Sequence, residues 1–238
     1  MNRVLVAMVL GGWSAVSLAG NLDGVNTLSQ SEFVVMSEDL AAAFSYKAGA
    51  PAEPLGTTGF DVGVAVSVTD LVDNKAVWDK VVSGGLDAIV VPKLYLQKGL
   101  PFDIDVGAYL TVVPGSNVKA WGAEIKYAII GGGMALPAVA VRASATSLFG
   151  ADQFTLKTQA VDVSVSKGFA LLTPYAGLGQ VRSTNTPEGN ASGLQVVDTS
   201  ETRAFIGAAF TPGIVNLAVE ADTVGGVASY NIKFGVAF

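Results

Sequence analysis

Charged side chains that alternate with apolar residues are the candidates for chemistry in this chain. Asp103 and Asp105 stand two residues apart, so an extended strand would place both carboxylates on one face, where they could share a proton or bind a cation. Bases more often neutralise such an acid pair, and Lys126 and Arg142 are the candidates. The full set of charged residues that the alternation turns to one polar side is Asp61, Lys93, Asp103, Asp105, Glu124, Lys126, Arg142, Asp162, Arg203, Glu220, Asp222 and Lys233.

The composition argues against an enzyme. The chain contains no His and no Cys, which excludes disulfides, thiolate metal sites, cysteine nucleophiles and every Ser-His or Cys-His pair. A Ser-Lys dyad stays open, although no motif supports one. The run 131–133 of three glycines is not a phosphate loop, because a predicted strand follows it where a helix would be needed. We therefore expect no catalysis, no metal and no cofactor.

The apolar content is high, and membrane-spanning helices do not account for it. Half of the residues are hydrophobic and 14% are charged, against about 25% charged in a typical soluble domain. The best candidate for a span beyond the N-terminal region runs from Tyr127 to Val141. Glycines at 131–133 and Pro137 interrupt this stretch, so it predicts a turn between two strands.

The N-terminal residues 1–19 have the pattern of a secretory signal. Arg3 provides the basic start, Val4 to Leu10 the apolar core, and Ser17 to Ala19 a small-residue exit, which predicts cleavage after Ala19. The alternative is an uncleaved anchor, but Gly11 and Gly12 interrupt the run too early for a span. The net charge is −6 before removal of Arg3, so an acidic exported protein without a basic run is expected not to bind nucleic acid.

Apolar residues recur with a period of two, which is the period of β-strands. Phe60, Val62 and Val64 face one way while Asp61 and Gly63 face the other, and the pattern recurs along the chain. We predict about ten strands, two of which contain a proline (Pro92 and Pro174). Their approximate ranges are 59–70, 86–96, 102–113, 118–130, 136–147, 154–166, 170–182, 200–210, 213–223 and 227–238.

Connection lengths distinguish a soluble β protein from a barrel in a membrane. With the C-terminus in the periplasm, the connections on that side are short, whereas 71–85 and 183–199 on the other side are long, as in outer-membrane barrels. Six aromatic residues at strand ends gather near the same periplasmic rim and predict an aromatic girdle. They are Phe60, Phe102, Tyr127, Phe169, Phe210 and Phe238.

The chain from residue 59 onward resembles Gram-negative outer-membrane β-barrel proteins. The signal through Ala19, the strands, the stretch 174–179 and the last strand, 230–238, which ends in Phe238, carry the resemblance. It implies the bacterial outer membrane as location, its lipid and lipopolysaccharide as surroundings, and the barrel-assembly machinery as a partner that recognises the terminal aromatic residue. The known enzymes of this class use a histidine, which this chain lacks. The subfamily and the ligand are not specified.

Residues 20–58 depart from the alternating pattern. Ser29 and Glu32 have the spacing of a capping box, and Phe33, Met36 and Leu40 fall on one helical face, which predicts a helix at about 30–46. Its apolar stripe would plug the lumen or pack at the periplasmic rim. An extra strand at 40–47 is the rival interpretation, and a second short helix is expected near 74–82.

We therefore predict an all-β fold, a transmembrane antiparallel up-and-down β-barrel of about ten strands (range eight to twelve) with a short N-terminal helical segment. Its divisions are a signal peptide at 1–19, an N-terminal helical or plug segment at 20–58 and the outer-membrane β-barrel at 59–238. The charged lumen is either a salt-bridged interior or a narrow conduit whose excess of acids favours cations. Three functions stay open: a narrow or plugged channel for small or apolar molecules, a non-conducting structural or adhesive barrel, and a soluble secreted β protein.

Overall fold

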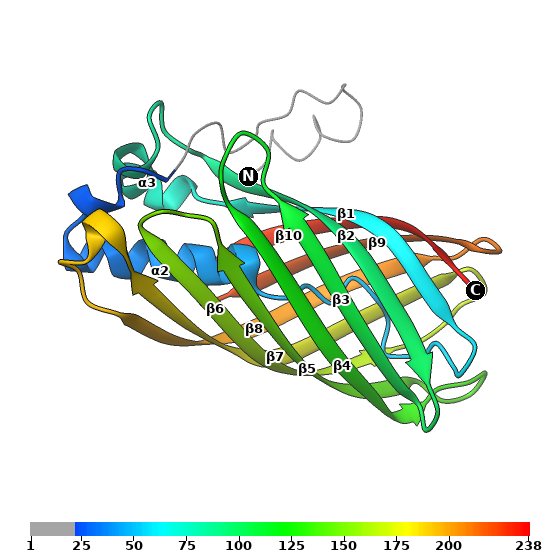
Figure 1. Ribbon diagram of the computed structural model, residues 1–238. Helices are drawn as coiled ribbons and strands as arrows, with labels where there is room; N and C mark the ends of the chain where they lie inside the picture. The colour runs from blue at the N-terminus through cyan, green and yellow to red at the C-terminus, as the bar shows by residue number, and fades with distance from the viewer. Residues whose placement is uncertain (1–21) are drawn as a thin grey trace.

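The strands form a closed barrel. The computed structural model describes residues 22–238, so the predicted signal and its cleavage site at Ala19 lie outside the described residues. Ten strands close in the order β1-β10-β9-β8-β7-β6-β5-β4-β3-β2, and every neighbouring pair is antiparallel (Figure 1). At the closing seam Phe238 and Phe60 exchange backbone hydrogen bonds of 2.6 and 2.9 Å. The predicted up-and-down barrel of ten strands is confirmed.

Each strand predicted from the alternation is present, with shifted ends. The strands are β1 (Phe60–Asp70), β2 (Ala88–Leu100), β3 (Ile104–Val112), β4 (Lys119–Gly131), β5 (Ala138–Phe149), β6 (Phe154–Ser166), β7 (Leu172–Pro187), β8 (Val197–Phe210), β9 (Val215–Val224) and β10 (Val227–Ala237). The pairing of β2 with β3 ends at Leu94 and Leu110, and Pro92 lies two residues beyond it. The pairing of β6 with β7 ends at Tyr175, and Pro174 lies next to it. Each proline therefore lies just beyond one of its two regular ladders, where the missing N–H is tolerated, and the carbonyl of Pro174 still accepts from Lys167 N at 3.2 Å.

The apolar face of the strands points outward. On β1, Val62, Val64 and Val66 are 42%, 56% and 36% exposed, while Asp61 and Ser67 are buried inside. This is the reverse of a soluble barrel, in which apolar residues fill the interior and polar residues meet water. The outer wall is therefore suited to lipid, and the structure does not support a soluble secreted protein.

The two ends of the barrel differ. We call the end that carries η2 (Val72–Asn74), α3 (Lys75–Val81) and η3 (Gly189–Ala191) the cap end, and the end that carries Phe60 and Phe238 the C-terminal rim. The turns at the C-terminal rim are short, and the two longest connections, 71–87 and 188–196, lie at the cap end, as expected. The predicted second helix near 74–82 is α3.

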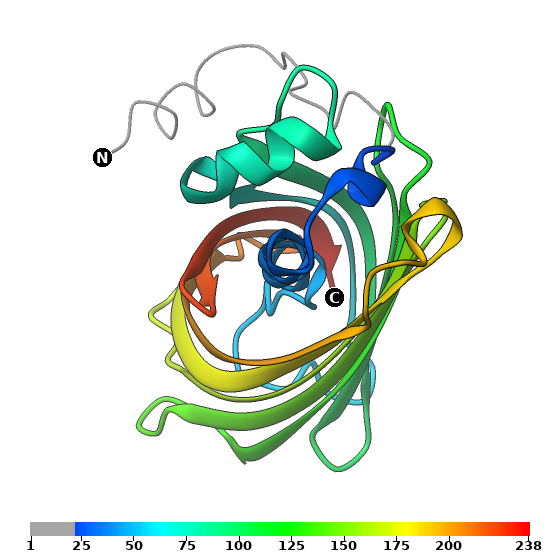
Figure 2. The ribbon, with the colours of Figure 1, turned by 90° about the vertical axis from the view of Figure 1, so that its left-hand side faces the viewer.

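The N-terminal helix lies inside the barrel. Helix α2 (Gln30–Phe44) follows η1 (Val25–Thr27), and viewed along the barrel axis it lies within the ring of strands (Figure 2). Its capping box is formed by Ser29 and Glu32, as the spacing predicts. The rival strand at 40–47 is wrong, because Leu40 to Phe44 are helical. No helix within residues 22–238 is long and apolar enough to cross a bilayer.

Candidate functional site in the lumen

Nearly all of the charged residues predicted to face the lumen do so. They are Asp61, Lys93, Asp105, Glu124, Lys126, Arg142, Asp162, Arg203, Glu220, Asp222 and Lys233, each no more than 8% exposed. Asp103 is the exception. It lies with Phe102 in the turn between β2 and β3, where both residues have positive φ angles (57° and 66°). The predicted carboxylate pair of Asp103 and Asp105 therefore does not form, because β3 begins only at Ile104.

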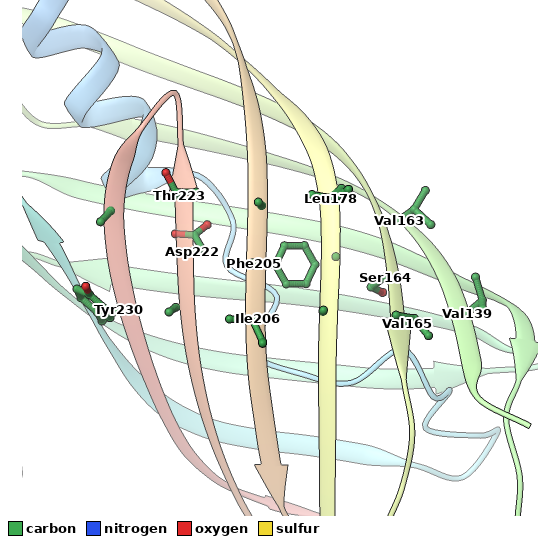
Figure 3. Close-up of a pocket in the computed structure, with 15 residues that line it drawn as sticks. Val139, Val163, Ser164, Val165, Leu178, Phe205, Ile206, Asp222, Thr223 and Tyr230 are labelled. Carbon is green, nitrogen blue, oxygen red and sulfur yellow. The ribbon is translucent and has the colours of Figure 1, made fainter.

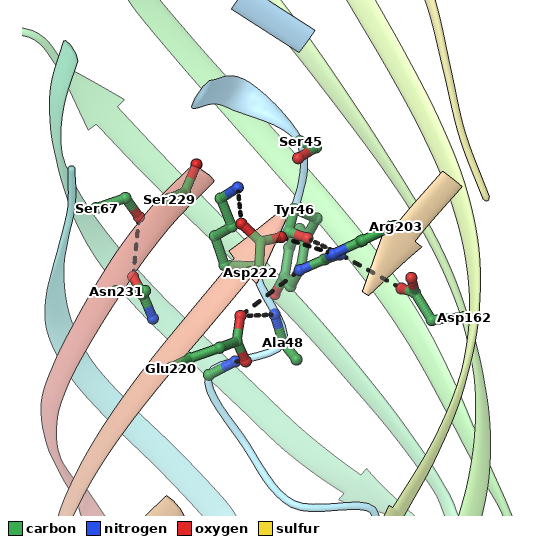
Figure 4. A network of polar contacts seen from close by, with 12 residues as sticks. Ser45, Tyr46, Ala48, Ser67, Asp162, Arg203, Glu220, Asp222, Ser229 and Asn231 are labelled. Carbon is green, nitrogen blue, oxygen red and sulfur yellow. Dashed lines mark hydrogen bonds and ion pairs between the residues drawn. The ribbon is translucent and has the colours of Figure 1, made fainter. Parts of the chain in front are cut away.

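A chain of alternating charges crosses the middle of the lumen (Figure 4). Lys47 Nζ lies 2.7 Å from Asp222 Oδ1, and Arg203 Nε lies 2.8 Å from Asp222 Oδ2. Asp162 continues the chain, because its Oδ2 is 3.5 Å from Arg203 and 2.6 Å from Arg142. Each charge of this chain thus has a partner of opposite sign, which offsets the cost of removing it from water.

The buried charges around this chain balance. Apart from Asp39, which belongs to the cap end, the lumen contains six buried acids and six buried bases. The acids are Asp61, Asp105, Glu124, Asp162, Glu220 and Asp222, and the bases are Lys47, Lys93, Lys126, Arg142, Arg203 and Lys233. The excess of acids expected from the sequence is absent, since Asp103 lies outside the lumen and Lys47 lies inside it. Among residues 22–238, the interior below α2 is therefore salt-bridged, with equal numbers of buried acids and bases.

Lys47 belongs to an irregular stretch, residues 45–58, that runs down the lumen from α2 to β1. We call this stretch the lumen segment. Its upper part is bound by side chains of the barrel wall: Arg203 Nη1 donates to Tyr46 O (2.6 Å), and Glu220 accepts from the N–H groups of Ala48 (3.2 Å) and Gly49 (2.8 Å). The backbone polar groups of a buried, irregular chain need such partners.

The lower part of the lumen segment is bound in the same way. Lys126 Nζ donates to the carbonyl oxygens of Pro51 and Glu53, both at 2.9 Å, and also pairs with Asp105 at 3.0 Å. Asp105 in turn accepts the N–H of Leu55 at 3.1 Å. The predicted neutralisation of Asp105 by Lys126 is therefore present, and the same two residues hold the lumen segment.

An apolar core closes the cap end of the lumen. Phe33, Met36 and Leu40 of α2 are fully buried in one cluster with Trp78 of α3 and residues of η1 and several strands. Within this core Asp39 accepts from Trp78 Nε1 at 2.7 Å and from Asn74 at 2.8 Å. Burial raises the pKa of Asp39 above its usual value despite these two donors.

Lys93 and Lys233 complete the interior. Lys233 Nζ is 2.5 Å from Asp61 Oδ2. The Lys93 ammonium lies 3.1 Å from Ser67 Oγ and 5.0 Å from the centre of the Tyr109 ring. Lys93 is therefore held by a hydroxyl and a cation–π contact, with no salt-bridge partner among the described residues.

The predicted aromatic girdle residues lie at the C-terminal rim or in its turns. Phe60 stacks on Phe238 with ring centres 5.7 Å apart, Phe210 ends β8, and Tyr127 lies near the end of β4. Phe102 and Phe169 lie in turns rather than at the starts of strands, at 87% and 61% exposure.

The outer wall carries a shallow depression of about 700 Å³ over β5 to β10 (Figure 3). Small residues such as Ala204 and Ala221 form its floor, while Val163, Leu178 and Ile206 stand around it and are exposed. Because this wall faces outward with apolar groups, membrane acyl chains would fill the depression.

No group of three or more Asp or Glu within residues 22–238 could hold a metal ion.

Comparison with known proteins gives structural matches at low sequence identity. No family model matches the chain, and no curated protein sequence matches it. Among solved structures, the KdgM porin aligns with a TM-score of 0.38 and 6% identity over 75% of this chain and 99% of its own. The outer membrane protein OprG from Pseudomonas aeruginosa aligns with a TM-score of 0.38 and 11% identity, over 79% of this chain and 99% of its own. Ail, the attachment invasion locus protein of Yersinia pestis, was solved in complex with a heparin analogue. It aligns with a TM-score of 0.30 and 12% identity, over 76% of this chain and 97% of its own.

Proposed function

We propose that this protein is a barrel of the bacterial outer membrane whose lumen is closed by its own N-terminal residues, and that it serves as a non-conducting structural or adhesive barrel with its cap end outside the cell. One observation carries the proposal: wall side chains bind the backbone of the lumen segment at Tyr46, Ala48, Gly49, Pro51, Glu53 and Leu55. A segment bound at so many points is a built part of the barrel.

Opening the lumen would break two different kinds of structure. In the lower half of the lumen, the bonds of the lumen segment to Glu220, Lys126 and Asp105 would break. Each broken bond would leave a buried polar group unpaired, at a cost of about 1–3 kcal/mol. The cap end would lose the apolar core around Trp78 and Phe33. Both losses favour a barrel that stays closed and interacts through its cap end.

A channel opened by displacement of the lumen segment is the second candidate. The hydroxyl groups of Tyr46, Tyr95 and Tyr175 are buried in the lumen without a hydrogen-bond partner among the described residues. Buried polar groups of this kind usually bind water. If the lumen segment moved, Tyr46 would leave with it, and the hydroxyl groups of Tyr95 and Tyr175 on the barrel wall would offer polar contacts along the opened lumen.

Conductance of the full chain in planar bilayers tests both candidates. Ala42 of α2 and Ala160 of β6 share one apolar cluster, so the variant Ala42→Cys, Ala160→Cys places two cysteines there, and a disulfide between them would fix α2 to the wall. The closed barrel predicts no current steps for the wild type or for this variant, oxidised or reduced. Steps that appear under voltage in the reduced variant and vanish on oxidation would favour the gated channel. Steady steps in the oxidised variant would refute closure by the N-terminal residues.

The partners expected from the sequence are part of the same proposal. Outer-membrane lipid and lipopolysaccharide would surround the apolar wall, and the barrel-assembly machinery would recognise the last strand. Phe238 supports this role by its position, because it joins β1 and β10 at the closing seam beside Phe60.

A further inference from the structure

The side chains of three bases have no ion-pair or hydrogen-bond partner among residues 22–238. They are Lys119, Lys157 and Arg182, and all three are exposed. Every other Lys and Arg of this part of the chain pairs with a carboxylate or donates to an oxygen. Even at the C-terminal rim, the exposed ammonium groups of Lys98 and Lys167 donate to carbonyl oxygens of turns. The three free bases therefore stand out as groups that could bind an anion.

The free bases lie on the outer wall, near the cap end. Lys119 belongs to β4, two residues above the exposed Trp121, while Lys157 of β6 and Arg182 of β7 lie four residues above the exposed Val161 and Leu178. In a tilted barrel strand, four residues rise about 10 Å along the axis. Because the polar layer on each side of a bilayer is about 5–8 Å thick, these long side chains reach the headgroups of a membrane around the apolar wall.

Lys157 and Arg182 are neighbours. In the pairing of β6 with β7, Lys157 is opposite Thr184 and Arg182 is opposite Gln159, so the two bases are diagonal on one face and within reach of each other. They line a polar depression of about 400 Å³ together with Thr184 and Asp198. The Asp198 carboxylate accepts from Thr184 Oγ1 at 2.6 Å. Two bases and one acid leave a net positive charge in this depression, which an anionic ligand would neutralise.

The apolar depression of the outer wall lies below the polar one, on the same three strands (Figure 3). Val163 of β6, Leu178 of β7 and Ile206 of β8 line the apolar depression. A free phosphate ion would use the polar depression alone. A ligand that fills both has an anionic head joined to apolar chains, which is the chemistry of a phosphorylated lipid.

We infer that β6, β7 and β8 form a binding site for one phosphorylated lipid, with its phosphate between Lys157 and Arg182 and its acyl chains in the apolar depression around Leu178. Arg binds phosphate through paired hydrogen bonds, and Lys adds a compact charge. The inference rests on the proposed outer-membrane location, and with the cap end outside the cell the lipid belongs to the outer leaflet.

Native mass spectrometry of the full chain in detergent tests this site, with lipid A that carries two phosphates as the probe and dephosphorylated lipid A as its control. Lys157→Gln and Arg182→Gln should each weaken binding of the phosphorylated probe about fivefold. Lys75→Gln is the matched control, because it removes the same charge from an exposed side chain of α3, and binding should not change. Asp198→Asn removes the negative charge from the depression and should tighten binding. The dephosphorylated lipid should bind the wild type and all variants equally.

Three results would overturn the site. Equal losses in Arg182→Gln and Lys75→Gln would reduce the effect to a general attraction between charges. Weaker binding in Asp198→Asn would show that the ligand is not held by its negative charge. Displacement of the lipid probe by inorganic phosphate at equal concentration would assign the polar depression to the free ion.

Failure of the proposed function gives a different result. The titrations in detergent require neither a closed lumen nor a particular orientation, so they do not depend on the conductance experiment. A chain that stays dispersed without detergent would refute the outer-membrane location itself, on which the lipid site rests. Heat-modifiable migration of each variant shows that the barrel has assembled.

Discussion

Removing the Glu220 carboxylate should destabilise the barrel, because this side chain joins β9 to the lumen segment. Glu220→Ala leaves the N–H groups of Ala48 and Gly49 buried without their acceptor, whereas Arg203 keeps Asp222 at 2.8 Å. Two orphaned donors at about 1–3 kcal/mol each predict a loss of about 2–6 kcal/mol in the free energy of unfolding. Glu220→Gln keeps one acceptor oxygen and should lose about half as much.

The measurement is urea unfolding of the protein in lipid vesicles, followed by tryptophan fluorescence, for the wild type and both variants. Hydrogen exchange of residues 46–50, measured by mass spectrometry, gives a local readout, and it should accelerate in Glu220→Ala more than in Glu220→Gln. If Glu220→Ala unfolds at the wild-type urea concentration and its exchange is unchanged, then the lumen segment does not depend on this contact and the reasoning fails.

Two further substitutions test the lipid face and the cap. Val64→Arg, in the middle of β1 and 56% exposed, should lower the free energy of unfolding in vesicles by about 2–4 kcal/mol because it places a charge in the bilayer. Val72→Arg, 62% exposed and outside the strands, should cost almost nothing. Equal losses in the two variants would contradict the inside–outside assignment. Asp39→Ala should cost about 1–3 kcal/mol because it leaves Trp78 Nε1 unpaired; unchanged stability and unchanged Trp78 fluorescence would show that this bond contributes nothing.

The strands and the direction of their side chains were predictable because each strand has one face toward lipid and one toward a polar lumen. Apolar and polar residues therefore alternate along every strand. The same period misled at Asp103. The alternation continues through Phe102 and Asp103 into β3, but β2 extends to Leu100, so these two residues must make the turn. A pattern of residue types does not mark where a ladder of hydrogen bonds stops.

The position of α2 was less predictable than its existence. The capping box and the apolar stripe indicate a helix, but they do not distinguish the lumen from the rim. The structure shows that Ser37 and Asp39, on the polar side of the stripe, are also buried, against Asn185 and against Trp78. The run of small residues at 41–43 fits a helix surrounded by a barrel wall on all sides. This run was the feature of the sequence that indicated a position inside the lumen.

Residues 20–58 were predicted as a helical or plug segment, but the contacts of the lumen segment could not have been predicted from the sequence. Lys47 lies outside any strand, so no period marks it as inward, yet it joins Asp222 in the central chain of charges. Glu220 and Lys126 were predicted to face the lumen, but their backbone partners at Ala48 and Pro51 depend on contacts between residues far apart in the chain. Side-chain to backbone bonds of this kind leave no trace in local sequence patterns.

The central claim is that residues 22–58 occupy the lumen of the native barrel, and a disulfide cross-link in intact cells tests it most directly. Ala52 of the lumen segment shares a buried cluster with Ala140 on the inner face of β5, whereas the adjacent Val139 faces outward. The account predicts an efficient disulfide in Ala52→Cys, Ala140→Cys and none in Ala52→Cys, Val139→Cys. Absence of the first disulfide, or equal yields from both pairs, would contradict it.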